Sequence, residues 1–500
     1  MGSIQILIFL GICSLFTLTL GKTDQTIVPY ASGKDVTEAV LARIKSSGVF
    51  LEDHFMMRRV AWVESKFGAA DHTFRSGHFG GIWQISEDRF NRTKEFALRE
   101  FHIKLAEEYG IVWASVTWED CLKPLHSALA ARLFLHLVRP DNDYMPGTLQ
   151  KQAELWFDQY TDNYLEISKE EFMKQVKELE AVAECEGRAD ICIVLDGSGS
   201  IAPSDFQTAR QFVVELIETF SFVNVRVAFL VYSTEMNIQF RMDNNLTRSE
   251  MLNVVRNTPH PREKTYTNQA IHLGVELFQN ATARPGVAQI MTVLTDGEST
   301  DGVTTGPGEA LRNNITTLSV GIGSGIGRDE LLLIANGILG NVYSLQDFDA
   351  LEEFFYKLNW DVCEVPQVPE FGDSSNDTLV QNEKRYYRIS IPAEGVTVTV
   401  NDVTGQTNVY YSFTHETPNS AFNDGVIRGP TFVRPPTKGF EEGEEEARIF
   451  VAVQGVAEEN AYEMKFETGN TVPPSDDNGS SGLVWSSFMI VLSVCSAFWF

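Results

Sequence analysis

Hydrophobic positions change their spacing twice along the chain. Up to about residue 180, apolar residues recur with the period of amphipathic helices, and strand signals are scarce. From about residue 185, short apolar runs alternate with helical patterns, and beyond about residue 370 apolar residues alternate singly with polar ones. The chain is therefore expected to hold an all-α domain over 30–180, an α/β domain over 185–363 and an all-β domain over 370–468.

The middle region has the pattern of a doubly wound α/β fold. Apolar runs predict buried strands, and the amphipathic segments between them predict helices. This alternation implies a mainly parallel sheet with helices on both faces. The expected strands cover 191–195, 225–232, 290–294 and 317–321, and the expected helices cover 206–220, 270–278 and about 347–358.

The third region has the two-residue period of strands separated by turns, which predicts a small antiparallel β-sandwich. It follows a Pro-containing linker at 365–369 and supplies no chemical site. A spacer and a weak carbohydrate-binding module both fit this pattern. The expected strands cover 386–391, 396–400, 408–412, 449–453 and 462–466.

Both ends of the chain have the features of processing signals. Residues 1–21 combine an apolar run with small residues at its end, as a secretory signal peptide does, although a signal anchor has a similar pattern. Residues 479–500 run from small polar residues into an apolar tail that no Lys or Arg follows, which is typical of a GPI-anchor signal rather than a spanning helix. The expected location is extracellular, on the cell surface, with membrane attachment through a lipid.

Cysteines and glycosylation motifs agree with an extracellular route. Of the six cysteines, Cys13 and Cys495 lie in the two signals, which leaves four in the mature chain. An even count in a secreted protein favours disulfides. Asn-x-Ser/Thr motifs predict glycosylation at Asn91, Asn245, Asn280, Asn314 and Asn376.

The chain is strongly acidic, with 40 Lys and Arg against 68 Asp and Glu and a formal net charge of −28 at pH 7. Because nucleic-acid binding requires a basic surface, no nucleic-acid partner is expected. The one dense acidic run, at 441–446, is interpreted as a solvated loop rather than a calcium cage.

Short oxygen side chains gather where the first strand of the middle region ends. Asp196-Gly-Ser-Gly-Ser200 follows that strand at once, Thr265 precedes a later helix, and the strand at 290–294 runs out into Asp296. The carboxyl ends of parallel strands border the crevice in which α/β proteins bind ligands. These carboxylates and hydroxyls suit a hard cation, Mg²⁺ first and Mn²⁺ or Ca²⁺ as alternatives, whose coordination an acidic group of a partner can complete.

Over about residues 188–363 this region resembles the von Willebrand factor A family, including integrin inserted domains. The resemblance rests on the family's Asp-x-Ser-x-Ser motif with its later Thr and Asp. It implies a metal-ion-dependent adhesion site and a protein ligand with an exposed carboxylate. The residues that match the site are Asp196, Ser198, Ser200, Thr265 and Asp296.

The same resemblance bears on the four remaining cysteines. Cys185 and Cys363 stand where this family often joins its termini, which implies a disulfide between them. Cys192 alternates inside a buried strand and is interpreted as a core thiol. Cys121 then lacks an obvious partner.

Three segments of the first region carry a second resemblance. Glu64 and Ser65 end an amphipathic helix, Gln84 closes the segment 80–85, and 127–137 is a helix with small residues on one face. Over about residues 35–165 this trio resembles the soluble lytic transglycosylase and goose-type lysozyme superfamily. The resemblance implies that Glu64 is a general acid whose pKa is raised by apolar neighbours, and that Gln84 belongs to the catalytic cleft.

This second resemblance is incomplete at two places. Ser86 stands where the goose-type pattern has an Asp, and the segment 153–158 lacks the Tyr-Asn pair of the transglycosylases. An enzyme that cleaves peptidoglycan or related N-acetylated glycans, a domain that only binds such glycans, and an inert platform therefore all stay open.

Three functions of the whole chain follow. The first is a surface protein that binds an acidic ligand through the metal site. The second is a tethered muramidase or lytic transglycosylase in innate defence, which the middle domain delivers to bacteria. The third is a non-catalytic matrix interaction protein.

Overall fold

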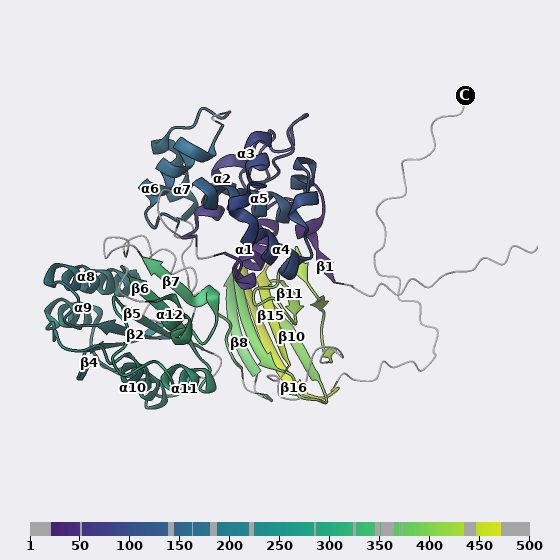
Figure 1. Ribbon diagram of the computed structural model, residues 1–500. Coiled ribbons are helices and arrows are strands. Elements are labelled where there is room, and N and C mark those ends of the chain that lie inside the picture. Colours follow the sequence, from purple (N-terminus) through teal and green to yellow (C-terminus); the bar gives the residue numbers. More distant parts are fainter. Residues whose placement is uncertain are drawn as a thin grey trace, which may run out of the picture.

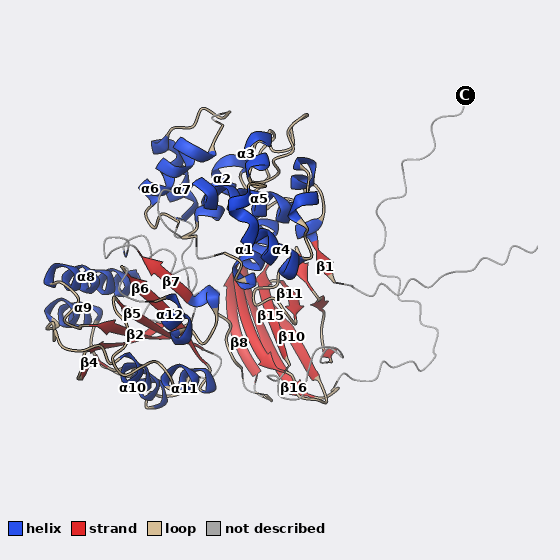
Figure 2. Cartoon of the chain, viewed as in Figure 1, coloured by secondary structure: helices blue, strands red, loops and turns tan. Residues whose placement is uncertain are grey.

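The computed structural model describes residues 22–50, 53–138, 145–162, 164–180, 188–219, 225–284, 287–323, 327–345, 351, 365–369, 371–372, 374–434 and 447–471. These residues form a helical unit, an α/β unit and a β unit (Figures 1 and 2). In this view the helical unit lies above the other two, which lie side by side. Both expected signals lie outside the described residues. The same holds for Cys185, for Cys363 and for the expected helix at 347–358, of which only Leu351 is described.

The helical unit is organised around one buried helix. Residues on all sides of α5 are buried, including Leu129, Arg132 and Phe134, as expected of a helix enclosed by others. None of the helices in the described ranges combines the length and apolarity of a membrane span. The helices are α1 (Lys34–Ser47), α2 (Met56–Ser65), α3 (Glu87–Arg92), α4 (Arg99–Tyr109), α5 (Pro124–Val138), α6 (Leu149–Leu155) and α7 (Lys169–Glu180), with the 3-10 turns η1 (Gln25–Ile27), η2 (Phe96–Leu98), η3 (Trp113–Ser115) and η4 (Trp118–Leu122) and the π-helix η5 (Trp156–Tyr160).

The α/β unit is built on a six-stranded sheet in the order β4-β3-β2-β5-β6-β7. Helices α8 and α9 supply the core on one face, and α10 and α11 supply it on the other. All residues of β2 are buried, as a central strand between two helical layers requires. The elements are β2 (Ala189–Asp196), α8 (Pro203–Thr219), β3 (Val225–Tyr232), β4 (Met236–Phe240), α9 (Arg248–Asn257), α10 (Thr267–Gln279), β5 (Ala288–Thr295), α11 (Gly306–Arg312), β6 (Ile315–Ile322), α12 (Arg328–Ile334), η6 (Leu339–Asn341) and β7 (Val342–Leu345).

The expectation of a parallel sheet needs one correction. Five strands run parallel, but β4 pairs with β3 in the antiparallel direction, so the sheet is mixed. Only the residues 233–235 separate the two strands, and a connection this short permits a hairpin but not a crossover. Residues Met236–Gln239 of β4 are half-buried, so its sequence lacks the apolar run that marks the central strands.

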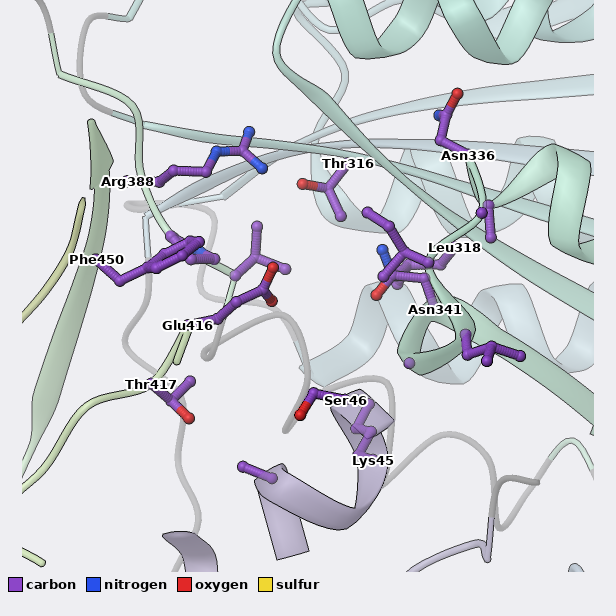
Figure 3. A pocket seen from close by; sticks show the side chains of 18 of the residues that line it. Lys45, Ser46, Thr316, Leu318, Asn336, Asn341, Arg388, Glu416, Thr417 and Phe450 are labelled. Atoms are coloured by element: carbon purple, nitrogen blue, oxygen red, sulfur yellow. The ribbon is translucent and has the colours of Figure 1, made fainter. Parts of the chain in front are cut away.

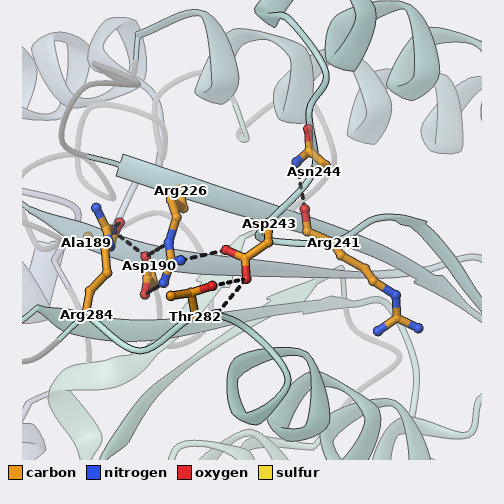
Figure 4. A network of polar contacts seen from close by, with 8 residues as sticks. All are labelled: Ala189, Asp190, Arg226, Arg241, Asp243, Asn244, Thr282 and Arg284. Carbon is orange, nitrogen blue, oxygen red and sulfur yellow. Dashed lines mark hydrogen bonds and ion pairs between the residues drawn. The ribbon is translucent and has the colours of Figure 1, made fainter.

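An ion-pair network centred on the buried Asp190 closes the amino-terminal edge of this sheet (Figure 4). The Asp190 side chain, 2% exposed, accepts hydrogen bonds from Nε and Nη2 of Arg226 at 2.8 and 2.5 Å, and a further one from Arg284. Arg226 also donates to Asp243 at 2.7 Å, and Asp243 accepts from the Thr282 hydroxyl at 3.0 Å. The network ties β2, β3 and the segments after β4 and α10 together.

Asp190→Ala is expected to lower the free energy of unfolding of the α/β unit by roughly 2–3 kcal/mol, because two partly buried guanidinium groups lose their shared carboxylate. Urea unfolding would measure the loss. Asp243→Ala is the matched control, since the Asp243 side chain is 39% exposed and its loss should cost below about 1 kcal/mol. Equal losses in the two variants would contradict the role assigned to Asp190.

The β unit consists of two four-stranded antiparallel sheets, in the orders β14-β10-β16-β8 and β13-β11-β15-β9. Their facing side chains form one core, within which the hydroxyls of Tyr387 and Tyr462 lie 2.6 Å apart. Four of the five expected strands lie within β10, β11, β15 and β16, and the fifth, 386–391, overlaps β9 and extends one residue beyond it. The strands are β8 (Ser374–Val380), β9 (Lys384–Ser390), β10 (Val396–Thr404), β11 (Thr407–Ser412), β12 (Phe422–Asn423), β13 (Gly425–Ile427), β14 (Thr431–Val433), β15 (Arg448–Gly455) and β16 (Glu459–Thr468).

The β unit docks onto the helical unit through a strand that precedes the region expected to be all-α, 30–180. Strand β1 (Thr23–Asp24) precedes the helices and pairs with β12 of the β unit. Phe422 is buried in the core of the helical unit, and Asp35 of α1 accepts a 2.8 Å hydrogen bond from Nζ of Lys384. The first and third units therefore contact each other directly, although the α/β unit separates them in the sequence.

Candidate metal site and candidate acid site

The candidate metal site lies at the carboxyl ends of two neighbouring parallel strands. Asp196 is the last residue of β2 and Asp296 follows the last residue of β5, and the two strands pair directly. Asp196 is fully buried and Ser198 is 1% exposed. Because both strands point the same way, their ends bring the two carboxylates to one edge of the sheet.

Four of the five expected residues are joined by hydrogen bonds. The hydroxyls of Ser198 and Ser200 lie 2.9 Å apart, and Ser200 Oγ donates to Asp296 Oδ1 at 2.8 Å. The backbone N–H of Ser198 donates to Asp196 Oδ1 at 2.8 Å. The turn after β2 and the residue after β5 therefore bring two hydroxyls and two carboxylates together.

The fifth expected residue, Thr265, lies on a loop packed against this turn. Arg262 N–H donates to the Gly197 carbonyl and Gly199 N–H donates to the Glu263 carbonyl, both at 2.8 Å. A Cβ at position 197 would lie 2.7 Å from a Pro261 side-chain atom, so glycine permits this close approach. Thr265 is 8% exposed, and its own hydrogen bonds in the described part of the chain are made by its backbone, to Thr300.

Burial dominates the electrostatics of the two carboxylates. It raises the pKa of Asp196 to about 6, although hydrogen bonds from Thr295 and Ser198 act in the opposite direction. Burial also raises the pKa of Asp296, against the hydrogen bond from Ser200. A cation among these oxygens would relieve the cost of one buried and one half-buried negative charge, so the donor set fits a divalent cation held by oxygen.

Two residues beside the site were not anticipated. Thr295 Oγ1 donates to Asp196 Oδ2 at 2.7 Å and so fixes the second oxygen of that carboxylate. His260 stacks on Phe206 with a ring-centroid distance of 4.2 Å, and its Nε2 lies 3.1 Å from the Ser198 carbonyl oxygen. Thr295 could have been found from the sequence, because it is a hydroxyl residue at the end of a buried strand. No spacing rule in the sequence points to His260.

Comparison with known proteins identifies the α/β unit. Residues 190–357 match the family model of the von Willebrand factor type A domain. The chain contains a VWA domain. The α/β architecture expected from the strand and helix pattern is thereby confirmed at the level of the fold, with a mixed rather than a wholly parallel sheet.

Three curated relatives match part of the chain. Vitrin of Bos taurus is 30% identical over 183 residues, which cover 36% of this chain and 28% of vitrin. The collagen alpha-4(VI) chain of Mus musculus is 28% identical over 180 residues, or 35% and 8% of the two chains. Matrilin-2 of Mus musculus is 27% identical over 243 residues, which cover 47% of this chain and 25% of matrilin-2. The chain thus spans less than a third of the length of these relatives.

Solved structures match the chain at low identity. Proximal thread matrix protein 1 from the mussel byssus, with a zinc-occupied MIDAS motif, is 22% identical with a TM-score of 0.33, over 40% of this chain and 50% of that chain. The von Willebrand factor type A protein from Catenulispora acidiphila is 17% identical with a TM-score of 0.33, and the match covers 56% of this chain and 58% of that chain.

The candidate acid site lies at the end of α2 in the helical unit. Glu64 is 5% exposed, and its Oε1 accepts a 2.7 Å hydrogen bond from Nε1 of Trp156. Burial raises the pKa of Glu64 to about 8, and the nearby charge of Asp162 acts in the same direction. The hydrogen bond from Trp156 acts in the opposite direction. Glu64 is therefore a carboxylic acid that keeps its proton at neutral pH.

Gln84 serves the loop that leads into this site. Its backbone φ is 50°, and its Nε2 donates to the carbonyls of Thr73, at 2.9 Å, and Gly81. Its Oε1 accepts from Arg75. Ser65 reinforces the same loop by donating to the Ile82 carbonyl at 2.6 Å. The structure thus gives Gln84 a loop-fixing role, and a role toward a substrate stays a prediction.

Trp156 is the partner of Glu64 that the sequence did not reveal. It opens the π-helix η5, in the segment 153–158 that lacks the expected Tyr-Asn pair. Insertion of an extra residue into a helical turn redirects the side chains that follow, and such turns recur at functional sites. Tyr160, at the other end of η5, donates a 2.6 Å hydrogen bond to the Trp83 carbonyl and anchors this turn.

The expected modification sites and thiols lie as follows. Cys121 and Cys192 are both buried and free, and burial raises the pKa of Cys192 to about 12. The expected disulfide between Cys185 and Cys363 stays a prediction, since both residues lie outside the described ranges. All five expected glycosylation sites are exposed: Asn91, Asn245, Asn280, Asn314 and Asn376.

Proposed function

We propose that this chain is an extracellular protein that binds an acidic group of a protein ligand through a divalent cation in its VWA domain. The observation that carries the proposal is the convergence of Asp196, Ser198, Ser200 and Asp296 at the carboxyl ends of β2 and β5. The similarity to a collagen chain and to matrilin-2 supports an extracellular setting.

The chemistry of the site favours an acidic ligand. Two carboxylates and two or three hydroxyls do not complete the coordination shell of a divalent cation. Water or an oxygen atom of the ligand would take the remaining coordination positions. Mg²⁺ suits six oxygen ligands with retained water, and Mn²⁺ and Ca²⁺ are the alternatives. A carboxylate presented by a partner can replace one of these waters, because its negative charge is attracted to the cation.

Pairs of immobilised peptides that differ only by Glu or Gln test this function. The purified chain is expected to bind Glu peptides in Mg²⁺, to bind their Gln counterparts much more weakly, and to be released by EDTA. Binding that is equal for Glu and Gln, or that persists in EDTA, would contradict the proposal. A chain with five exposed glycosylation motifs is best produced in a secreting eukaryotic host for this assay.

Attachment to the cell surface is part of the same proposal. The expected GPI signal at 479–500 would place the VWA domain outside the membrane on a lipid anchor. Phosphatidylinositol-specific phospholipase C is then expected to release the protein from intact cells, and retention after this treatment would contradict a lipid anchor of that type.

A second candidate function is cleavage of N-acetylated glycans such as peptidoglycan by the helical unit. Glu64 favours it, because a carboxylic acid that stays protonated up to about pH 8 can donate its proton to a glycosidic oxygen at neutral pH. Release of soluble fragments from purified peptidoglycan, with a lysozyme as positive control, tests this activity. Binding of the glycan without cleavage would support a passive platform instead.

Trp156→Phe is expected to slow any such cleavage about tenfold, the effect of losing roughly 1.4 kcal/mol of transition-state stabilisation. The variant keeps the ring packing on Phe172, whose centroid lies 4.8 Å away, but it removes the N–H that orients Glu64. Because that hydrogen bond lowers the pKa of Glu64, the alkaline limb of the pH–rate profile should move upward.

The pH–rate profile separates this positioning role from a purely structural one. Trp113→Phe is the matched control, since the Trp113 indole donates to the Thr93 hydroxyl at 3.0 Å and not to Glu64. An unchanged profile in Trp156→Phe, or the same shift in Trp113→Phe, would refute the positioning role of Trp156.

A further inference from the structure

The loop after β5 begins with Asp296 and then runs past the start of α10. Thr300 of this loop exchanges two hydrogen bonds with Thr265: its N–H donates to the Thr265 carbonyl at 2.7 Å, and its Oγ1 accepts from the Thr265 N–H at 3.4 Å. The backbone of one expected ligand is thus bound to the loop that carries another. The cavity in Figure 3 is lined by Thr316, near the start of the parallel strand β6, and so lies at the opposite edge of the sheet.

Asp301, the next residue of this loop, caps α10. Its Oδ1 accepts from the Asn268 N–H at 3.2 Å, and its Oδ2 accepts from the Gln269 N–H at 3.0 Å. The Ser299 hydroxyl donates to the same Oδ1 at 2.5 Å and so fixes the carboxylate. The first N–H groups of a helix have no partner within it, and the side chain of Tyr266, at the cap position, accepts from none of them. A carboxylate from another part of the chain therefore replaces the usual cap, and its charge suits the positive end of the helix dipole.

A second cap runs in the opposite direction, from α10 to the start of α11. Asn268 Oδ1 accepts three consecutive backbone N–H groups, those of 304–306, at 3.2, 3.2 and 2.9 Å. A Cβ at Gly306 would lie 2.9 Å from the Asn268 carbonyl oxygen, so glycine permits this close approach. Val303, between the two caps, is buried in the core that α10 and α11 share with the sheet. The loop after β5 is thus fixed to α10 at two places.

We propose that Asp301 is a positioning residue of the candidate cation site and acts through Thr265. The proposal rests on the cation binding proposed above. Thr265 is 8% exposed, and its hydroxyl makes no hydrogen bond within the described part of the chain, so this hydroxyl is available to a cation. Without the Asp301 carboxylate, the start of α10 and the loop after β5 would lose their common support. The distance between Thr265 and Asp296 would then no longer be fixed.

Mn²⁺ titration of the full chain, followed by electron paramagnetic resonance, tests this proposal in a double-mutant cycle. Asp301→Ala is expected to weaken Mn²⁺ binding about 10- to 100-fold, the usual effect of removing a group that orients a metal ligand. Added to Thr265→Ala, it should weaken binding by no more than about twofold further, because both changes remove the same contact. Effects that multiply in the double variant would show that Asp301 acts without Thr265 and would overturn the proposal.

Two further variants separate positioning from folding. Asp301→Asn keeps one side-chain oxygen for the N–H groups of α10 and should weaken Mn²⁺ binding less than Asp301→Ala. It takes the place of Asp301→Ala in the cycle if circular dichroism in EDTA shows that the latter does not fold. Asp243→Ala removes a carboxylate that also accepts a backbone N–H and a hydroxyl, but at the amino-terminal edge of the sheet (Figure 4), and should leave Mn²⁺ affinity unchanged. An equal loss of affinity in Asp243→Ala would assign the effect to stability and overturn the proposal.

The same titration distinguishes failure of this proposal from failure of the proposed function. A wild-type chain without a saturable Mn²⁺ site would overturn cation binding and, with it, the role of Asp301. A wild-type site that both Asp301 variants leave unchanged would overturn the role of Asp301 alone.

Discussion

Glu64→Gln is expected to stabilise the helical unit at pH 7 by roughly 2–3 kcal/mol. Burial raises the pKa of Glu64 from 4.5 to about 8, so the folded state holds a proton that the unfolded chain releases. Below about pH 4.5 both states are protonated and the variant gains nothing. The gain grows as the pH rises from 4.5 to about 8 and is constant above that, because Gln carries no charge to bury.

Urea unfolding of the two proteins across this pH range measures the effect. Glu107→Gln is the matched control, because Glu107 is exposed on α4 and its replacement should change stability little at any pH. A Glu64→Gln variant no more stable than the wild type at pH 7, or a difference that does not change with pH, would refute the account of Glu64 as an acid held in an apolar site.

The same variant decides whether the helical unit cleaves glycans. Loss of a general acid slows a reaction by about 10²- to 10⁴-fold, so Glu64→Gln should reduce cleavage at least that far while it increases stability. Exchange of stability for activity is typical of catalytic positions. Wild-type protein that fails to cleave would leave the binding or platform functions, and a variant that retains activity would contradict the role of Glu64 as general acid.

Asp196→Ala is expected to weaken divalent-cation binding by at least about 100-fold, since it removes one of two carboxylates from the donor set. Binding of Glu peptides in Mg²⁺ should disappear with it. The fold should persist, because the fully buried Asp196 carboxylate is itself a cost in the cation-free protein. Calorimetric titration with Mn²⁺ measures the affinity directly.

Asp329→Ala is the control for this variant. Asp329 is an exposed carboxylate at the start of α12 of the same domain, and its removal changes the net charge equally without touching the donor set. Similar Mn²⁺ affinities in the two variants would mean that the loss reflects charge in general and not a site at Asp196.

The metal edge was accessible to sequence reasoning for a physical reason. A strand buried on both faces reads as a continuous apolar run, so its end at Asp196 is marked by the first polar residue. Strand β5 behaves likewise, and parallel pairing then brings Asp196 and Asp296 to one edge. Local pattern and topology thus explain why the two carboxylates lie close together, and their role in binding a cation stays a prediction.

Other features left no periodic signal. Strand β4 is half-buried at the edge of its sheet. In β8 exposed and half-buried polar residues alternate, and Leu379 is the buried residue of this strand. The pairing of β1 with β12 involves two residues from each strand, about 400 positions apart in the sequence. Trp156 reaches Glu64 through a π-helical turn, whose extra residue departs from the helical period on which sequence patterns depend.

The central claim is that the VWA domain holds a divalent cation between Asp196, Ser198, Ser200 and Asp296. Titration of the purified full chain with Mn²⁺, followed by electron paramagnetic resonance, tests it most directly. The predicted result is one saturable Mn²⁺ site per chain that excess Mg²⁺ displaces and that the combined Ser198→Ala and Ser200→Ala replacement removes. Absence of a saturable site in the wild type, or an undiminished site in that double variant, would contradict the claim.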